Sequence, residues 1–192
     1  MRRFLPLALL AAAPLVVAVA GAWAQDAKPA EAKAAPAIAL KDTEGKDHTL
    51  EQYKDKIVVL EWTEPGCPYI VRHAKAQTLK KLQADYGAKG VVVLGICTSR
   101  FTDAAAMKAF CGEHKIDYPV LMDTTGAVGR AYGASNTPHM FVVHKGKIVY
   151  AGAIDDDAKG SKKEGVVNYV RSAIDEIIAG KPVTTASTKP YG

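Results

Sequence analysis

The chain has 192 residues, of which 23% are charged, and its formal net charge is +5. Its lysines and arginines are mixed with acids and form no basic stripe interleaved with aromatic side chains, which argues against nucleic-acid binding. The length suits one folded domain with a single hydrophobic core, and the chain contains no internal repeats.

The first 24 residues have the pattern of a secretory signal peptide. Two arginines precede an apolar run over residues 5–20, and Ala22-Trp23-Ala24 forms a small-x-small cleavage site. The alternative is a retained membrane anchor, although the apolar run is short for a spanning helix. Cleavage leaves a periplasmic or secreted protein that begins near Gln25, has a net charge of +3 after losing both arginines, and has no stable membrane insertion.

Hydrophobic patterning predicts alternating strands and helices after a flexible linker at residues 25–36. Short apolar runs predict strands at 37–40, 56–62, 91–96 and 119–122, and a hairpin at 140–143 and 147–151. Apolar residues at three-to-four spacing predict helices at 68–86, 104–114, 127–132 and 166–178. Parallel strands joined by helices, then a closing hairpin, give an α/β sandwich with a mixed sheet over residues 37–180, followed by an irregular tail at 181–192.

Cys67 stands at the junction between the strand at 56–62 and the helix that begins at Pro68. The partial positive charge of a helix N-terminus stabilises a thiolate, which is the reactive form of cysteine. Proline fits the first helical position because its missing N–H would have no partner there. Cys67 is therefore a candidate nucleophile.

The chain contains three cysteines, Cys67, Cys97 and Cys111, so an exported monomer keeps at least one of them unpaired. They form no Cys-x-x-Cys pair, and the ligand pairs of a structural zinc site are missing. Cys97 follows the strand at 91–96, and the carboxyl ends of parallel strands share one crevice, so Cys97 is the candidate resolving thiol. The alternative is that Cys97 is a small buried residue and Cys67 works alone. We expect Cys111 to be an inert core thiol on an apolar helix stripe.

Three segments in this order resemble the thioredoxin fold, and more narrowly the redoxin group of alkyl hydroperoxide reductases and thiol-specific antioxidant proteins. They are residues 61–68 (EWTEPGCP), 136–143 (NTPHMFVV) and 147–152 (KIVYAG). The resemblance implies a thioredoxin-like three-layer sandwich with a mixed central sheet flanked by helices. It also implies a cis peptide bond at Pro138, which would lie against the nucleophile, while Thr137 offers backbone atoms to a substrate.

The same resemblance assigns roles to other residues. Glu61 takes the place of the buried acid that moves the nucleophile's proton, and burial should raise the pKa of this carboxyl. The alternative is a Glu61 side chain that faces solvent at the sheet edge. The expected substrate-binding residues are Trp62, Pro68, Thr137, Pro138 and His139.

Several positions depart from the family patterns. Ile70 replaces the second cysteine of the thioredoxin pair, and Glu64 replaces the threonine or serine that peroxiredoxins place three residues before their cysteine. Pro138 stands where peroxiredoxins have an arginine. Arg72 could supply a positive charge instead, but we expect it at the surface. Related chains often have a further cysteine after a Tyr-Gly pair like Tyr191-Gly192, and we expect no resolving thiol in the tail here.

The sequence predicts an exported thiol oxidoreductase in which the Cys67 thiolate attacks a protein disulfide or a hydroperoxide. A mixed disulfide or a sulfenic acid forms, and Cys97 or an external thiol reductant resolves it. No cofactor is expected, because the chain has neither a phosphate-binding glycine loop nor a nucleotide fingerprint. Two alternatives remain: a non-catalytic interaction module, and a copper-binding thiol protein that uses Cys67 and His139, with or without Cys97.

We predict that export removes residues 1–24. When the whole chain is expressed in a Gram-negative bacterium, the periplasmic fraction should contain a protein whose N-terminal sequence starts at Gln25, because small residues flank the preceding site. Intact mass and N-terminal sequencing measure this. A membrane-bound protein that keeps its first residues would support the retained anchor instead.

Overall fold

The computed structural model describes Met1 and residues 32–192. The predicted signal peptide beyond Met1 and most of the predicted linker at 25–36 lie outside the described residues. Within the described part, no helix has the length and apolar character needed to cross a membrane.

A five-stranded mixed sheet forms the centre of the domain, with the strand order β5-β4-β3-β6-β7. Its strands are β3 (Ile57–Trp62), β4 (Val91–Cys97), β5 (Val120–Met122), β6 (His139–His144) and β7 (Lys147–Gly152). Strand β3 pairs parallel with β4 and antiparallel with β6, so that Trp62 lies opposite both Ile96 and His139. Two further short strands, β1 (Ala39–Lys41) and β2 (Asp47–Thr49), form a separate antiparallel pair that the sequence patterning only half predicted.

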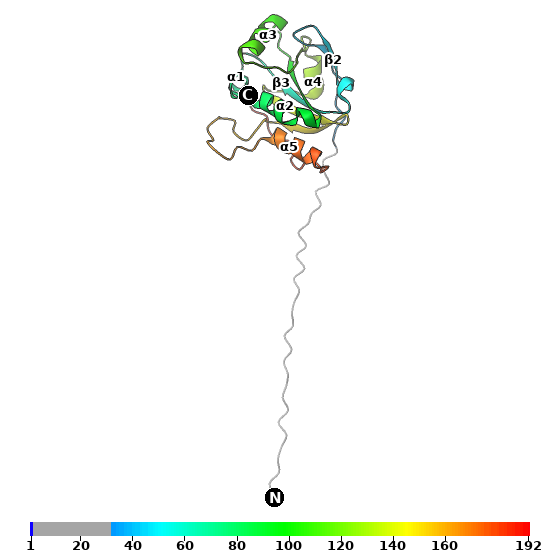
Figure 1. The fold of residues 1–192 in the computed structure, drawn as a ribbon, viewed down its shortest axis with the longest axis vertical. Coiled ribbons are helices and arrows are strands. Elements are labelled where there is room, and N and C mark those ends of the chain that lie inside the picture. Colours follow the sequence, from blue (N-terminus) through cyan, green and yellow to red (C-terminus); the bar gives the residue numbers. More distant parts are fainter. Residues whose placement is uncertain (2–31) are drawn as a thin grey trace.

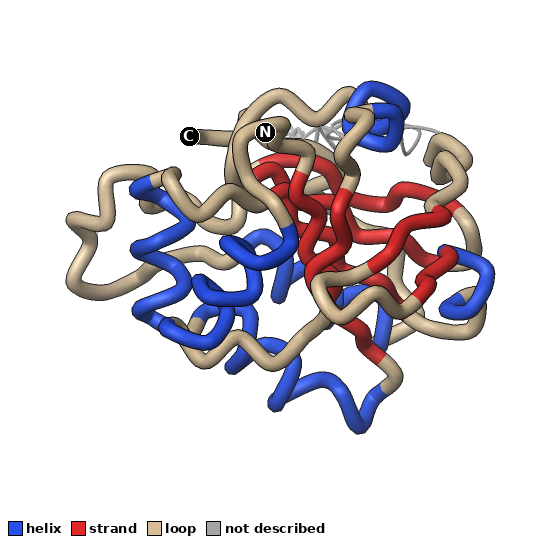
Figure 2. Tube along the Cα trace, turned by 90° about the horizontal axis from the view of Figure 1, so that it is seen from above, coloured by secondary structure: helices blue, strands red, loops and turns tan. Residues whose placement is uncertain are grey.

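Helices cover both faces of this sheet (Figures 1 and 2). They are α1 (Pro68–Ala76), α2 (Thr78–Tyr86), α3 (Ala104–Glu113), α4 (Ala127–Tyr132) and α5 (Tyr169–Ile178), with short 3-10 turns at Leu50–Tyr53 and Gly87–Lys89. One face packs against α2 and α5 through residues such as Leu82 and Ile174. The opposite face packs against α4 and the N-terminal segment through Tyr132 and Ile38. The predicted three-layer α/β sandwich with a mixed sheet is therefore confirmed.

The predicted single helix at 68–86 is wrong in one respect, because Gln77 divides it into α1 and α2. Gln77 has left-handed backbone angles (φ 57°, ψ 35°). Its side-chain amide donates hydrogen bonds to the carbonyls of Ala74 and His114, at 2.7 and 2.6 Å. The break therefore gives α1 a polar C-terminal cap and links it to the end of α3, an interaction that helical periodicity does not reveal.

The last helix also begins later than predicted. Asn168 caps α5 by accepting a hydrogen bond from the Arg171 N–H at 2.9 Å. Val166 and Val167, which were expected on the apolar face of this helix, precede it and are 42% and 47% exposed. The Asn168 side chain binds a free N–H group of the first helical turn, and this cap sets the start of α5. The apolar pattern alone placed that start earlier, at Val166.

Segments on both sides of the predicted domain pair with β7. The carbonyl of Lys33 accepts a hydrogen bond from Ile148, so the end of the predicted linker is bound to the sheet. The tail at 181–192 forms neither a helix nor a named strand, but its Thr188 N–H donates to the Ala151 carbonyl. The tail therefore follows β7 and ends beside α1 (Figure 1).

Candidate active site

Cys67 occupies the N-cap position of α1, directly after the loop that leaves β3. Its backbone is extended, and Pro68 holds the first helical position, as expected from the sequence. The side chain is half-buried. Its thiol donates a hydrogen bond to the Thr137 carbonyl, with 2.8 Å between sulfur and oxygen. The candidate nucleophile is thus reachable and lies at a helix N-terminus.

The peptide bond between Thr137 and Pro138 is cis, as the family resemblance implied. Pro138 is buried and immediately precedes β6. The antiparallel register of β3 and β6 places Trp62 opposite His139, which brings the loop before β6 to the loop after β3. This register is the reason why Thr137 meets Cys67.

Glu61 lies within β3, and only 4% of it is exposed, so the alternative of a solvent-facing side chain is wrong. The Tyr118 hydroxyl donates a hydrogen bond to its carboxyl at 3.1 Å. Burial raises the pKa of Glu61 from the ordinary 4.5 to about 7, and the hydrogen bond from Tyr118 partly opposes this rise. The carboxyl can therefore gain or lose a proton near neutral pH.

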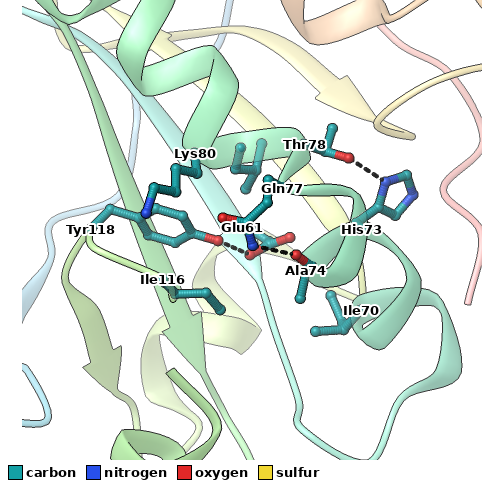
Figure 3. A pocket seen from close by; sticks show the side chains of 10 residues that line it. Glu61, Ile70, His73, Ala74, Gln77, Thr78, Lys80, Ile116 and Tyr118 are labelled. Carbon is teal, nitrogen blue, oxygen red and sulfur yellow. Dashed lines mark hydrogen bonds between the residues drawn. The ribbon is translucent and has the colours of Figure 1, made fainter. Parts of the chain in front are cut away.

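A cavity of about 10 Å³ lies next to Glu61, between α1, the start of α2 and Tyr118 (Figure 3). Ile70, His73 and Gln77 contribute to its walls. A space of this size holds about one water molecule. Such a water would lie beside the Glu61 carboxyl, which Figure 3 shows directed toward α1.

Cys97 ends β4 and is completely buried. Its thiol lies 3.9 Å from one carboxylate oxygen of Glu64, whose other oxygen accepts a hydrogen bond from Thr102 at 2.6 Å. Burial, together with the negative charge of Glu64, raises the pKa of Cys97 to about 11. Cys97 is therefore a protonated thiol at neutral pH.

All three cysteines contribute to one apolar cluster and all are free thiols. Cys97 is one of the buried members of this cluster, and Cys67 and Cys111 are partly buried residues that pack against the cluster. Burial and the neighbouring Glu61 raise the pKa of Cys111 to about 11. The tertiary structure thus brings Cys67 and Cys97 into one environment, although no bond joins them.

Two of the expected substrate-binding residues are mainly structural in their contacts. Trp62 is buried against Tyr132 and Phe141, and its indole N–H donates to the Thr98 hydroxyl at 3.1 Å. His139 is buried, and its ring accepts a hydrogen bond from the Ser135 N–H at 3.3 Å. Burial lowers the pKa of His139, which keeps the ring neutral. Pro68 is exposed beside Cys67, where a substrate can reach it.

In the described part of the chain, no three His, Cys, Asp or Glu side chains converge to hold a metal ion. The Cys67 thiol is directed to Thr137, and a ring nitrogen of His139 is directed to Ser135. These side chains are therefore not assembled as the copper ligand set that was considered as an alternative.

The sequence did not reveal how the tail meets α1. Arg72 was expected at the surface, but its guanidinium donates to the carbonyls of Ala158 and Asp157, at 2.7 and 3.1 Å. It also lies over the rings of Tyr69 and Tyr191, with 5.6 and 5.7 Å to the ring centroids. Arg72 therefore binds the loop after β7 and packs on the tail, and among the described residues it donates no hydrogen bond to Cys67.

The tail also reaches the cis-proline loop. The Asn136 side-chain amide donates to the Gly192 carbonyl at 3.0 Å. Gly192 packs so closely on the backbone of Thr137 that a Cβ atom on it would collide with the Thr137 carbonyl. No local sequence pattern pointed to this contact, because the partners lie 56 residues apart.

Comparison with known proteins gives a consistent family relationship. The redoxin family model matches residues 30–170. The thiol-disulfide oxidoreductase ResA of Bacillus cereus is 27% identical over 153 residues, which are 79% of this chain and 83% of that protein. Chloroplastic peroxiredoxin Q of Triticum aestivum is 29% identical over 139 residues, which are 70% of this chain and 55% of that protein.

Among solved structures, the thioredoxin domain of a thiol-disulfide oxidoreductase from Bacteroides vulgatus superposes with a TM-score of 0.57. It is 26% identical to this chain, and the match covers 64% of this chain and 87% of that one. The expected thioredoxin-like fold is thereby confirmed.

The raised pKa of Glu61 predicts a pH-dependent stability. The unfolded chain loses this proton near pH 4.5 and the folded chain near pH 7, so the stability of the fold decreases as pH rises between these values. Glu61→Gln removes this loss. The variant should match the wild type at about pH 4 and exceed its free energy of unfolding by about 3 kcal/mol at about pH 8. Urea denaturation at both pH values measures this, with Glu164→Gln on an exposed loop as the control. Equal stabilities at the higher pH would contradict it.

Proposed function

We propose that this chain, which belongs to the redoxin family, is a thiol oxidoreductase that exchanges disulfides through the Cys67 thiolate. The observation that carries the proposal is the position of the Cys67 sulfur, at the first turn of α1 and 2.8 Å from the carbonyl before cis-Pro138. A sulfur placed there lies at the partially positive N-terminus of a helix, which favours a thiolate. It also lies beside the backbone of Thr137. The ResA relative, named as a thiol-disulfide oxidoreductase, supports the same chemistry.

In the first step, the Cys67 thiolate attacks one sulfur of a substrate disulfide. A bond forms between Cys67 and that sulfur, the substrate S–S bond breaks, and the other substrate sulfur leaves as a thiolate that takes up a proton. The product is a mixed disulfide between Cys67 and half of the substrate. Thr137 offers backbone atoms that can hold the substrate chain beside Cys67.

In the second step, another thiol attacks the sulfur of Cys67 and releases the rest of the substrate as a thiol. We propose Cys97 for this step because it shares the apolar cluster with Cys67. Its pKa of about 11 means that it must lose a proton before it attacks. The Glu64 carboxylate, 3.9 Å from the Cys97 thiol, is placed to receive that proton. An external thiol reductant then reopens the Cys67–Cys97 disulfide.

Glu61 completes the proposed proton handling. Its pKa of about 7 allows it to exchange protons near neutral pH, and the adjacent cavity can hold about one water molecule. Tyr118 acts as a positioning residue, because its hydroxyl holds the Glu61 carboxyl and favours the charged form. Glu61 thus serves as a proton reservoir that is separate from the nucleophile.

Reduction of a hydroperoxide is the second candidate function, and the match to peroxiredoxin Q favours it. In that reaction the Cys67 thiolate takes one peroxide oxygen and becomes a sulfenic acid, while the peroxide leaves as an alcohol or water. Two observations rank it second. Glu64 presents a carboxylate where peroxiredoxins present a hydroxyl, and the guanidinium of Arg72 is engaged with the loop after β7.

We also propose that the protein works after export, in the periplasm or outside the cell, on protein thiols or disulfides. The argument is the signal-peptide pattern in the first 24 residues. An external thiol reductant would then be required to complete the cycle, because the oxidised pair cannot reduce itself.

We predict that Cys67 alone captures a disulfide substrate. Reduced protein is mixed with a neutral small disulfide, bis(2-hydroxyethyl) disulfide, and followed by intact mass. The wild type should pass through a mixed disulfide to a Cys67–Cys97 crosslink, and Cys67→Ser should lose the reaction at least about a hundredfold. Cys97→Ser should accumulate the mixed disulfide, and Cys111→Ser, the matched control, should behave as the wild type. A mixed disulfide that persists in Cys67→Ser would contradict the proposal.

The same protein treated with hydrogen peroxide and a sulfenic-acid trap separates the two chemistries. If peroxide reacts with Cys67 faster than the disulfide does, peroxide reduction becomes the leading function. If neither reagent modifies Cys67 in the wild type, the non-catalytic interaction module is the better description.

We predict that Glu61 sets the pH dependence of substrate release. The rate at which the mixed disulfide closes to the Cys67–Cys97 crosslink should rise as pH passes about 7, where Glu61 becomes able to take up the proton that Glu64 receives from Cys97. Glu61→Gln should remove this inflection, and Tyr118→Phe should move it to higher pH because the charged carboxyl loses a donor. Stopped reactions analysed by mass across the pH range measure this. An unchanged inflection in Glu61→Gln would assign the titration to another group.

A further inference from the structure

A groove of about 710 Å³ lies on the side of α4, and two of the residues that line it contact Cys67. Glu64 and Thr137 line its inner end, and both contact Cys67: the Glu64 carbonyl accepts the Cys67 N–H at 3.0 Å, and the Thr137 carbonyl accepts its thiol. The volume is in the range of sites that hold a ligand of a few residues. The groove therefore extends to residues that contact the nucleophile.

Two arginines line the groove without a carboxylate partner. Arg130 belongs to α4 and donates to the Thr125 carbonyl at 3.2 Å, and Arg100 belongs to the loop after β4. Among the described residues, neither guanidinium lies within ion-pair distance of an acid. Both side chains are exposed, so they remain available to an anionic ligand.

The acids near the groove are already engaged. Glu64, the acid that lines it, accepts a hydrogen bond from Thr102. Asp123 lies beneath the groove and accepts hydrogen bonds from Thr98 at 2.9 Å and from the Gly129 N–H at 2.8 Å. Asp103 caps α3 by accepting from the Ala106 N–H. These carboxylates keep their charge, but Asp123 is buried and Glu64 is only partly exposed, so the exposed charged side chains that line the groove are the two cationic ones.

Phe101 adds an apolar contact at the same rim. It is 85% exposed, and the Arg100 guanidinium lies over its ring at 4.8 Å from the centroid. The groove floor beneath is held by hydrogen bonds, because Trp62 donates to Thr98, which in turn donates to Asp123. A fixed floor with a cationic and aromatic rim is suited to bind a polypeptide segment rather than a bare ion.

We propose that this groove selects polypeptide substrates that carry acidic side chains next to the reacting cysteine. Arg100 and Arg130 would bind the carboxylates, Phe101 would cover an apolar side chain, and Thr137 would hold the backbone as the substrate sulfur meets Cys67. The inference rests on the proposed disulfide exchange and names the substrate class of the same site.

The test uses three blocked pentapeptides whose central cysteine is activated as a mixed disulfide with pyridine-2-thiol. Glutamate, glutamine or lysine flanks the cysteine. Release of the thione gives the rate of capture by the whole reduced protein. At low salt, the glutamate peptide should react about tenfold faster than the lysine peptide, and about 0.5 M salt should reduce this ratio to about twofold.

The variant Arg100→Gln/Arg130→Gln should bring the ratio to about twofold without salt and leave the rate with the glutamine peptide within about twofold of the wild type. The matched control is Lys46→Gln/Lys181→Gln, which removes the same charge from exposed positions outside the groove. It should keep the wild-type ratio. Equal urea midpoints for both double variants establish that each is folded.

The outcomes distinguish the proposed selectivity of the groove from the proposed disulfide exchange by Cys67. Equal rates for the three peptides in the wild type, or a ratio that survives Arg100→Gln/Arg130→Gln, would overturn the groove assignment while leaving disulfide exchange intact. If no peptide reacts with Cys67, the proposed disulfide exchange is wrong. Calorimetry with versions of the same peptides that carry serine in place of cysteine then measures whether the groove prefers acidic peptides. Tighter binding of the glutamate version, lost in the arginine double variant, supports it, and equal binding refutes it.

Discussion

The arrangement of the site depends on one contact, in which the Cys67 thiol reaches the carbonyl that precedes cis-Pro138. The two partners lie 70 residues apart, and the antiparallel pairing of β3 with β6 brings them together. That register fixes Trp62 opposite His139, so the chain leaving β3 and the chain entering β6 meet at the same end of the sheet. Because α1 begins at Cys67, the same point also receives the positive end of a helix.

Two glutamates near this contact have different environments and therefore suit different roles. Glu61 is enclosed between β3, α1 and Tyr118, and its removal from water raises its pKa to about 7. Glu64 lies in the loop before Cys67, where it accepts a hydrogen bond from Thr102 and lies next to the Cys97 thiol. The protein thus places one carboxyl with a pKa near neutral between the sheet and α1, and one carboxylate beside the buried Cys97 thiol.

Access to the sulfur is asymmetric. On the side of α1, Tyr191 packs near Tyr69 and His73, and Gly192 lies against Thr137, so the tail covers this flank of the cis-proline loop. On the side of α4, the groove remains open and ends at Thr137. Asn136 borders both regions, since it binds the tail through its side chain and also lines the groove. The open groove with the unpaired arginines is the side from which we propose that a substrate approaches Cys67.

The sequence by itself determined the order of the five central strands and the helix start at Cys67, because each follows from local chemistry or from a short apolar pattern. It left the burial of Glu61 open, and the packing around β3 decided it. It did not predict the break at Gln77, since the amide that stabilises it bonds to His114 on another helix. Only the tertiary structure decided that Arg72 is held by the tail and that Cys97 faces Glu64. Those contacts join residues distant in sequence, and their geometry depends on strand register and loop packing, which a linear pattern does not specify.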